Sequence, residues 1–155
     1  MESEKTIQDA IYHSMLTEKD AMDFYRTASQ YVRNPDARKT LELLAQEERE
    51  HAEWFHRICN GVDLEEFLEL IDSGPNENSD WLIKLKEINL ENGELEVLEI
   101  AMRQEKELEK ELARIAAETS DEDVRRIYQA NIESTREHFK MIAEEYNRLK
   151  ELLFS

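Results

Sequence analysis

The sequence predicts an all-α protein, a single domain over residues 1–155 that folds as an antiparallel four-helix bundle with a long crossover between helices 2 and 3. Three observations predict this fold. The chain has 3 glycines and 2 prolines, too few for the many turns of a sheet. Apolar residues recur at helical spacing in four long stretches. Between the second and third stretches this spacing weakens over enough residues for the chain to run back along the bundle.

The first helical hairpin is predicted over residues 4–60. Its first helix covers residues 4–33 and ends before Pro35, because the residue that precedes a proline is displaced from the helical region of backbone space. Asp36 is able to cap the second helix, which stops at Asn60-Gly61, a typical helix end. The two helices are therefore expected to lie antiparallel.

The crossover is predicted over residues 61–92, where turn residues gather. Two short amphipathic pieces, residues 64–71 and 81–88, give it partial helical structure. The second hairpin follows over residues 93–153, and its two helices are separated near residues 119–121. Because the crossover returns the chain along the bundle, helices 2 and 3 are expected to run in the same direction.

The two hairpins are predicted to be copies of one unit. Glu18 and Glu105 are 87 residues apart, and so are His51 and His138. The string Arg-Glu-His that ends at each histidine recurs with the same offset. Neither hairpin can bury its apolar stripe alone, so the two are expected to pack in one bundle or to exchange between chains.

Five ionisable side chains fall at mid-helix on the apolar stripes, where the core of a bundle should lie: Glu18, Glu48, His51, Glu105 and His138. Burial of unpaired carboxylates is costly and brings like charges together. Lysine and arginine side chains are expected to point outward at this level. A metal ion is therefore the expected counter-charge, and this ligand set suits iron, manganese or zinc. The alternatives are solvated charges beside the core and, for His138, a core histidine bonded to a neighbouring carboxylate.

The spacing of one pair sharpens the metal interpretation. Glu48 and His51 are three positions apart, so both project from one face of a helix and can bind the same centre. A Glu-x-x-His motif together with a lone glutamate from each of two other helices is the inward-facing pattern of ferritin-like carboxylate bundles. By contrast, His13 and His56 point about 140° away from the proposed ligands at 100° per residue, so both are expected at the surface.

The chain resembles the rubrerythrin-like branch of the ferritin-like superfamily. Glu18, followed by Phe24-Tyr25, is similar to the family's first-helix ligand and aromatic pair. The string Gln-Glu-Glu-Arg-Glu-His-Ala over residues 46–52 is similar to the family's second-helix signature, which is the most specific part of the resemblance. The similarity covers nearly the whole chain.

The resemblance implies a non-haem centre, with two iron ions expected, that is oxidised by peroxide or dioxygen in peroxide reduction or ferrous iron oxidation. Glu48 would bridge or chelate, and His51 and His138 would each give one nitrogen to an ion. Glu18 and Glu105 would be terminal ligands. Glu48 and Tyr25 are the candidate catalytic residues. Tyr25 lies seven residues after Glu18, near the same face, where it could hydrogen-bond a ligand or serve in core packing.

The sequence departs from the family pattern at Thr135. The family carries a second Glu-x-x-His on the fourth helix, and here threonine occupies its first position, in Ser-Thr-Arg-Glu-His. Glu133 and Glu137 are each about 200° around the helix from Thr135, so neither substitutes. A single-metal site, or a pair completed by water, is therefore an open alternative. The one cysteine, Cys59, excludes a cysteine-rich iron domain, so electrons would come from a partner protein or from substrate iron.

The charge and hydropathy of the chain restrict its partners and location. The net charge is −17, which repels nucleic acid and anionic lipid, so neither is expected as a partner. We see no long apolar run, so neither a signal peptide nor a transmembrane helix is expected, and one cysteine fits a reducing cytoplasm. A homodimer is the default expectation.

Three functions follow from these observations. The first is an oxidoreductase of rubrerythrin type that binds iron in pairs. The second is a non-catalytic or single-metal iron-handling protein whose site has degenerated at Thr135. The third is a helical scaffold or dimerisation protein whose polar core residues satisfy one another.

Overall fold

The computed structural model describes residues 4–88 and 93–154, and within these ranges the chain forms six helices and no strand. The four long helices are α1 (Glu4–Tyr31), α2 (Pro35–Arg57), α5 (Gly93–Glu118) and α6 (Glu122–Phe154). Two short helices, α3 (Leu64–Asp72) and α4 (Asp80–Lys86), form part of the crossover. The prediction of an all-α bundle is confirmed. The last part of the predicted crossover, residues 89–92, lies outside the described residues.

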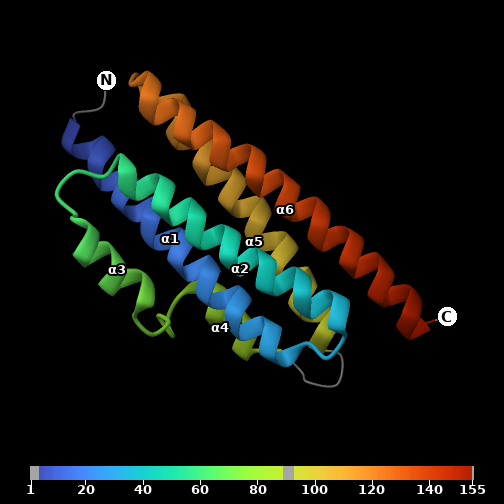
Figure 1. Ribbon diagram of the computed structural model, residues 1–155. Helices are drawn as coiled ribbons and strands as arrows, with labels where there is room; N and C mark the ends of the chain where they lie inside the picture. Colours follow the sequence, from blue (N-terminus) through green and yellow to red (C-terminus); the bar gives the residue numbers. More distant parts are fainter. Residues whose placement is uncertain (1–3, 89–92, 155) are drawn as a thin grey trace.

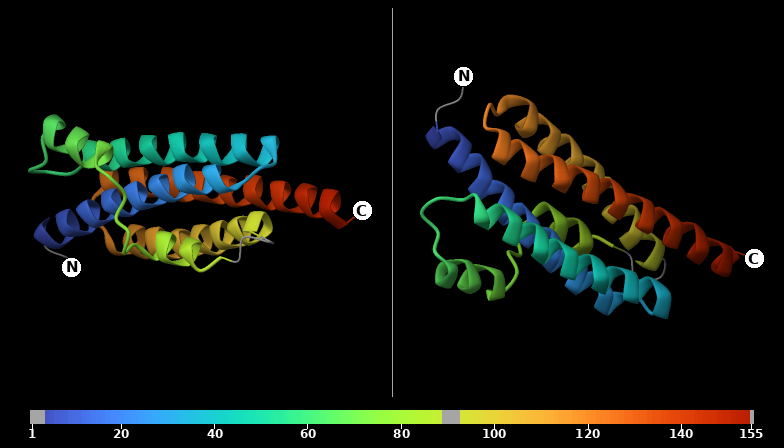
Figure 2. Two further views of the ribbon diagram at one scale, coloured as in Figure 1. Left: turned by 90° about the horizontal axis from the view of Figure 1, so that it is seen from below. Right: turned by 45° about the horizontal axis from the view of Figure 1, so that its top comes forward.

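The four long helices form a bundle of two antiparallel hairpins. α1 packs on α2, α5 packs on α6, and the two hairpins meet through α2 with α6 and α1 with α5. Figure 1 shows that α2 and α5 run in the same direction, as predicted from the crossover. In Figure 2, α3 lies on the outer side of the first hairpin, while α4 lies against α1 and α5. The two helices at opposite corners of the bundle therefore belong to different hairpins.

Local hydrogen bonds explain where the helices begin. The Asn34 side chain accepts a hydrogen bond from the Ala37 amide at 3.1 Å, and Pro35 begins α2. The cap is thus Asn34, not the predicted Asp36, because a cap residue must lie outside the helix and Asp36 is already in its first turn. Asp63 and Ser79 cap α3 and α4 in the same way. These short polar side chains set where the crossover helices begin through local hydrogen bonds.

Aromatic residues of the crossover close one face of the bundle. The Trp81 ring on α4 lies 5.3 Å from Phe24 and 5.8 Å from Tyr25, between ring centroids. Phe67 on α3 stacks on His56 at 4.6 Å. His56 Nε2 also lies 2.8 Å from the Val62 carbonyl oxygen. His56 is therefore only partly exposed, because these contacts cover part of its side chain.

One lysine is buried under the crossover, against the expectation that all lysines point outward. Lys19 is 4% exposed, and its Nζ lies 2.5 Å from Asp23 Oδ2 and 3.2 Å from the Gly74 carbonyl oxygen. Both hydrogen bonds satisfy the ammonium group outside the bundle core. Lys19 is therefore a tether for the crossover, and it is paired with Asp23 instead of with the core glutamates.

The described helices were also compared with the requirements of a membrane span. None of those within residues 4–88 and 93–154 combines the length and the apolar character needed to cross a bilayer.

Candidate metal centre

The five predicted ligand residues lie in the middle of the bundle core. α1 supplies Glu18, α2 supplies Glu48 and His51, α5 supplies Glu105, and α6 supplies His138. All five side chains are between 0% and 2% exposed. Each helix presents its residue inward for the same reason: the residue occupies a core position of the 3.6-residue repeat. Four separate helices thus converge on one small volume.

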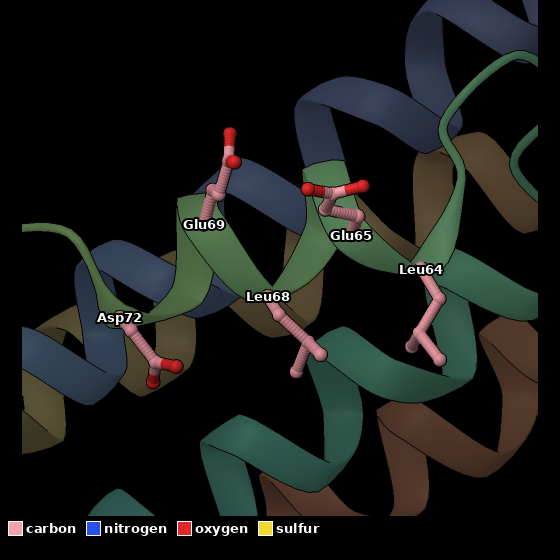
Figure 3. A pocket seen from close by; sticks show the side chains of 5 residues that line it. All are labelled: Leu64, Glu65, Leu68, Glu69 and Asp72. Atoms are coloured by element: carbon pink, nitrogen blue, oxygen red, sulfur yellow. The ribbon is translucent and has the colours of Figure 1, made fainter.

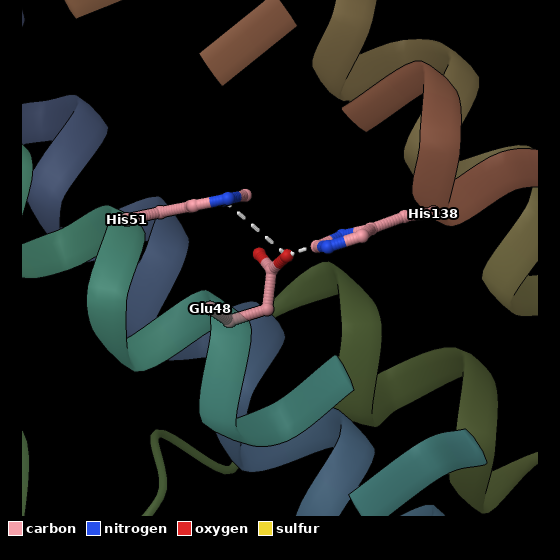
Figure 4. A group of neighbouring side chains, drawn as sticks. All are labelled: Glu48, His51 and His138. Atoms are coloured by element: carbon pink, nitrogen blue, oxygen red, sulfur yellow. Dashed lines mark ion pairs between the residues drawn. The ribbon is translucent and has the colours of Figure 1, made fainter. Parts of the chain in front are cut away.

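The cluster has two halves that share one carboxylate. His51 Nδ1 lies 3.5 Å from Glu18 Oε2, within the first hairpin. His138 Nδ1 lies 3.6 Å from Glu105 Oε1, within the second. Glu48 Oε1 lies 3.6 Å from His51 Nδ1 and 2.8 Å from His138 Nδ1. Figure 4 shows the Glu48 carboxylate between the two imidazoles, with one dashed ion pair to each. Glu48, His51 and His138 could together hold a metal ion.

The atoms that face one another in this cluster have no hydrogen-bond partner among the described residues. They are both oxygens of Glu18 and Glu48, Glu105 Oε2, and Nδ1 of each histidine. His138 Nδ1 is close to Glu48 Oε1, but the pair does not have the geometry of a hydrogen bond. Buried polar atoms are normally paired, so this set of unpaired oxygen and nitrogen atoms could accept a cation. The donor set therefore fits a bound transition-metal cation.

Burial and mutual charge shift the pKa values of several cluster residues. Burial, together with the charges of Glu18 and Glu105, raises the pKa of Glu48 well above its usual value. Burial also acts to raise the pKa of Glu18, but the nearby His51, Glu48 and His138 side chains together outweigh it and the pKa is lowered. Burial lowers the pKa of His138, but the carboxylates around it, Glu105 first, raise it overall. A cation bound here would compete with protons for the same ligand atoms.

Comparison with known families agrees with this geometry. A family model for rubrerythrin matches residues 9–146. The chain belongs to the rubrerythrin family. No curated protein and no solved structure matches the chain. The match includes all five residues of the cluster and confirms the resemblance to the ferritin-like di-iron superfamily.

Tyr25 connects the rubrerythrin cluster to the aromatic residues beneath the crossover. Its hydroxyl donates to Glu105 Oε1 at 2.5 Å, and both side chains are fully buried. Its ring makes an edge contact with Phe24 at 5.2 Å. Burial and the nearby charge of Glu105 raise the pKa of Tyr25, so the phenol stays protonated. Tyr25 therefore combines core packing with a hydrogen bond to a predicted ligand, and that ligand belongs to the other hairpin.

Thr135 lies in the core beside the cluster and offers it no carboxylate. The threonine is 1% exposed, and its hydroxyl donates to the Asn131 carbonyl oxygen of its own helix at 2.8 Å. Glu133 and Glu137 are both exposed, and Glu137 pairs with Lys140 at 3.2 Å. Neither acid substitutes for the missing group. The second hairpin therefore contributes one carboxylate, Glu105, to the cluster.

Two residues that sequence reasoning missed contact the outer edges of the histidines. His138 Nε2 lies 2.6 Å from Glu47 Oε2, and His51 Nε2 lies 2.7 Å from Ser134 Oγ. Both residues lie beside the apolar stripe, so the stripe did not identify them. The signal that could have found them is the repeat, because positions 47 and 134 are separated by the same 87 residues as the histidines.

Two surface grooves lie outside the buried cluster. One passes over the edge of the site and is lined in part by Glu47, Trp54, Ser134 and His138. The other is on the outer face of α3, where the exposed Leu64 and Leu68 lie on one side of the helix and Glu65 and Glu69 on the other (Figure 3). The α3 groove is lined by leucines and carboxylates alone. The first groove is therefore the one that adjoins the cluster, at His138 and its neighbour Glu47.

Proposed function

We propose that this protein is a non-haem iron oxidoreductase of rubrerythrin type that binds two iron ions in the buried cluster. The observation that carries the proposal is the set of buried carboxylate and imidazole atoms without partners, arranged as two halves around Glu48. Each hairpin supplies one terminal glutamate and one histidine, which is what two neighbouring cations require. Manganese or zinc would fit the same donors.

We assign one role to each residue of the cluster. Glu18 and His51 would hold one ion, Glu105 and His138 the other, and Glu48 would bridge or chelate. Bound iron would supply the electrons that reduce peroxide or dioxygen. The reduction of peroxide to two water molecules also consumes protons, and Tyr25 holds one at its hydroxyl, hydrogen-bonded to Glu105. The dry core keeps bulk water from these groups.

The electrons would reach the cluster from outside these 155 residues. A four-cysteine iron site cannot form within these 155 residues, because Cys59 is the single cysteine. We therefore propose that a separate electron-donor protein or ferrous iron itself supplies them. A cytoplasmic location and a homodimer are part of the same proposal. Exposed apolar side chains on α3 and at the end of α6 are available for a dimer contact.

A single-metal, non-catalytic protein is the second candidate. Thr135 favours it, because three carboxylates offset less positive charge than the four of the usual ferritin-like set. The scaffold function is less well supported, since the cluster atoms do not satisfy one another.

An iron titration tests the proposal and separates the candidates. The protein is titrated with ferrous iron without oxygen, its metal content is measured, and peroxide is then added while absorbance is followed. Two ions per chain and rapid peroxide-dependent oxidation support the oxidoreductase. One ion without peroxide oxidation indicates the iron-handling protein, and no uptake indicates the scaffold.

A variant of Glu48 ties the result to the cluster. Glu48→Gln should lose at least about tenfold in iron affinity and yet fold normally, since the amide resembles the protonated carboxyl of the metal-free state. Glu50→Gln, an exposed change on the same helix, is the matched control. Equal affinity for the two variants would contradict the assignment of Glu48.

A further inference from the structure

The two histidines of the cluster are supported by a crossed pair of hydrogen bonds between α2 and α6. Glu47 on α2 reaches His138 on α6, with 2.6 Å between Oε2 and Nε2. Ser134 on α6 reaches His51 on α2, with 2.7 Å between Oγ and Nε2. In both histidines Nε2 faces outward and Nδ1 faces the other ligands. Each helix therefore orients the histidine of its neighbour.

The two supporting residues occupy equivalent positions in the repeat. Glu47 directly precedes Glu48, and Ser134 directly precedes Thr135, with the same offset that relates His51 to His138. The backbone thus places a side chain at the same point beside each histidine. The chemistry at this point differs, since one side chain is a carboxylate and the other a neutral hydroxyl.

This difference affects the two imidazoles unequally. An ionised carboxylate only accepts hydrogen bonds, so Glu47 requires the proton of His138 to be on Nε2, which leaves the Nδ1 lone pair for a cation. A serine hydroxyl donates or accepts, so Ser134 does not select one tautomer of His51. A carboxylate partner also makes a ligating imidazole a stronger electron donor.

We propose that Glu47 and Ser134 are positioning residues that hold His138 and His51 for metal binding through Nδ1, and that Glu47 makes the His138 position the tighter of two unequal metal positions. This inference rests on the proposed two-ion site. It does not depend on the reaction that the site performs.

Both supporting side chains can be changed without opening the core. The Glu47 side chain is 35% exposed in the groove beside Trp54, and Ser134 is partly exposed on the same surface. Their variants are therefore expected to fold. The cluster residues themselves, which are fully buried, remain in place.

Nuclear magnetic resonance of the ¹⁵N-histidine-labelled protein, titrated with Zn²⁺ alone, tests the proposal. Less than one equivalent of Zn²⁺ should shift the Nδ1 resonance of His138 before that of His51, and both histidines should end with the proton on Nε2. Calorimetry should show two binding steps of unequal affinity. Simultaneous shifts of both histidines, or ligation through Nε2, would overturn the proposal.

Variants then assign the asymmetry to the supporting residues. Glu47→Gln should weaken the tighter step by about 10- to 100-fold and move the His138 resonances. Ser134→Ala should move those of His51 and leave the tighter step unchanged. The exchange Glu47→Ser with Ser134→Glu should reverse the order in which the histidines respond. Glu50→Gln removes the same charge from an exposed position and is the control. The proposal would be overturned if Glu47→Gln and Glu50→Gln had the same Zn²⁺ affinities and the same His138 resonances.

Failure of this inference is distinguishable from failure of the proposed function. A protein that binds Zn²⁺ in the expected order but does not oxidise ferrous iron with peroxide would retain the inference and refute the oxidoreductase. A protein that binds iron and reacts with peroxide but shows two equal Zn²⁺ positions would retain the oxidoreductase and refute the inference. The absence of any Zn²⁺ binding would refute both.

Discussion

The hydroxyl of Tyr25 on α1 donates a 2.5 Å hydrogen bond to Glu105 on α5, across the boundary between the two hairpins. The repeat offers no equivalent of this bond, because the residue 87 positions after Tyr25 is Leu112. Glu18, the counterpart of Glu105, keeps both oxygens without a hydrogen bond. The duplicated fold therefore carries an asymmetric site.

Removal of this hydroxyl should affect both stability and reactivity. Tyr25→Phe should lower the free energy of unfolding of the metal-free protein by about 1.5 to 3 kcal/mol, since a buried carboxylate loses its donor. Peroxide-dependent oxidation should slow while the amount of bound iron stays the same. Denaturant unfolding and stopped-flow absorbance measure the two effects.

Tyr128→Phe is the matched control for Tyr25. It removes another buried hydroxyl, which lies 2.7 Å from Ser14 Oγ and makes no hydrogen bond to a cluster carboxylate. This variant should lose stability without a change in the oxidation rate. Equal rates for wild type and Tyr25→Phe would contradict a role for Tyr25 in the reaction.

Restoration of the fourth carboxylate should separate metal affinity from stability. Thr135→Glu should destabilise the metal-free protein, because a further acid enters a core that already holds three, and should raise metal occupancy. Thr135→Gln, similar in size but uncharged, is the control and should not raise occupancy. Metal analysis after equilibration with limiting Fe²⁺ measures the difference, and unchanged occupancy in Thr135→Glu would count against the alignment of α6.

The buried pair of Lys19 and Asp23 should stabilise the crossover. Lys19→Met leaves Asp23 buried without its partner, so the free energy of unfolding should fall by about 3 to 5 kcal/mol. Amide hydrogen exchange near Gly74 should also accelerate, because its carbonyl loses the ammonium donor. Lys39→Met, at an exposed position, is the control.

The double variant Lys19→Met with Asp23→Leu should regain most of the stability, since no unpaired charge remains. Its measured free energy of unfolding shows whether Lys19→Met loses stability because Asp23 is left unpaired or because packing is lost. A double variant less stable than Lys19→Met alone would show that the pair does not account for the loss.

Asp20 should make stability depend on pH. Burial raises the pKa of Asp20 from 3.8 to about 6, although the charge of Lys19 opposes the rise. The folded protein then binds this proton more tightly than the unfolded chain, so stability is lost as pH rises from about 4 through 6. Asp20→Asn should therefore raise the denaturant midpoint at about pH 7.5 and leave it unchanged near pH 4. Asp9→Asn, exposed on the same helix, should show no such difference.

The sequence by itself determined the helices and the composition of the cluster. Helical periodicity, short polar caps and turn residues act over a few positions, so they could be found without tertiary contacts. The burial of Glu18, Glu48 and His51 followed from their places on apolar stripes. The 87-residue repeat extended the same reasoning to the second hairpin. Thr135 was recognised as the position of a missing carboxylate from the resemblance to the family, whose fourth helix carries a second Glu-x-x-His.

Only the tertiary structure decided which neighbouring side chains support the cluster. Glu47 and Ser134 lie beside the stripes, and their contacts depend on the axial register of α2 against α6. The bond from Tyr25 to Glu105 depends in the same way on α1 against α5. Lys19 is buried because the crossover returns over its face of α1. Periodicity predicts which side of a helix faces inward. Which side chains the inward and flanking residues contact depends on the axial position and rotation of the neighbouring helix, and side-chain packing across the bundle sets both.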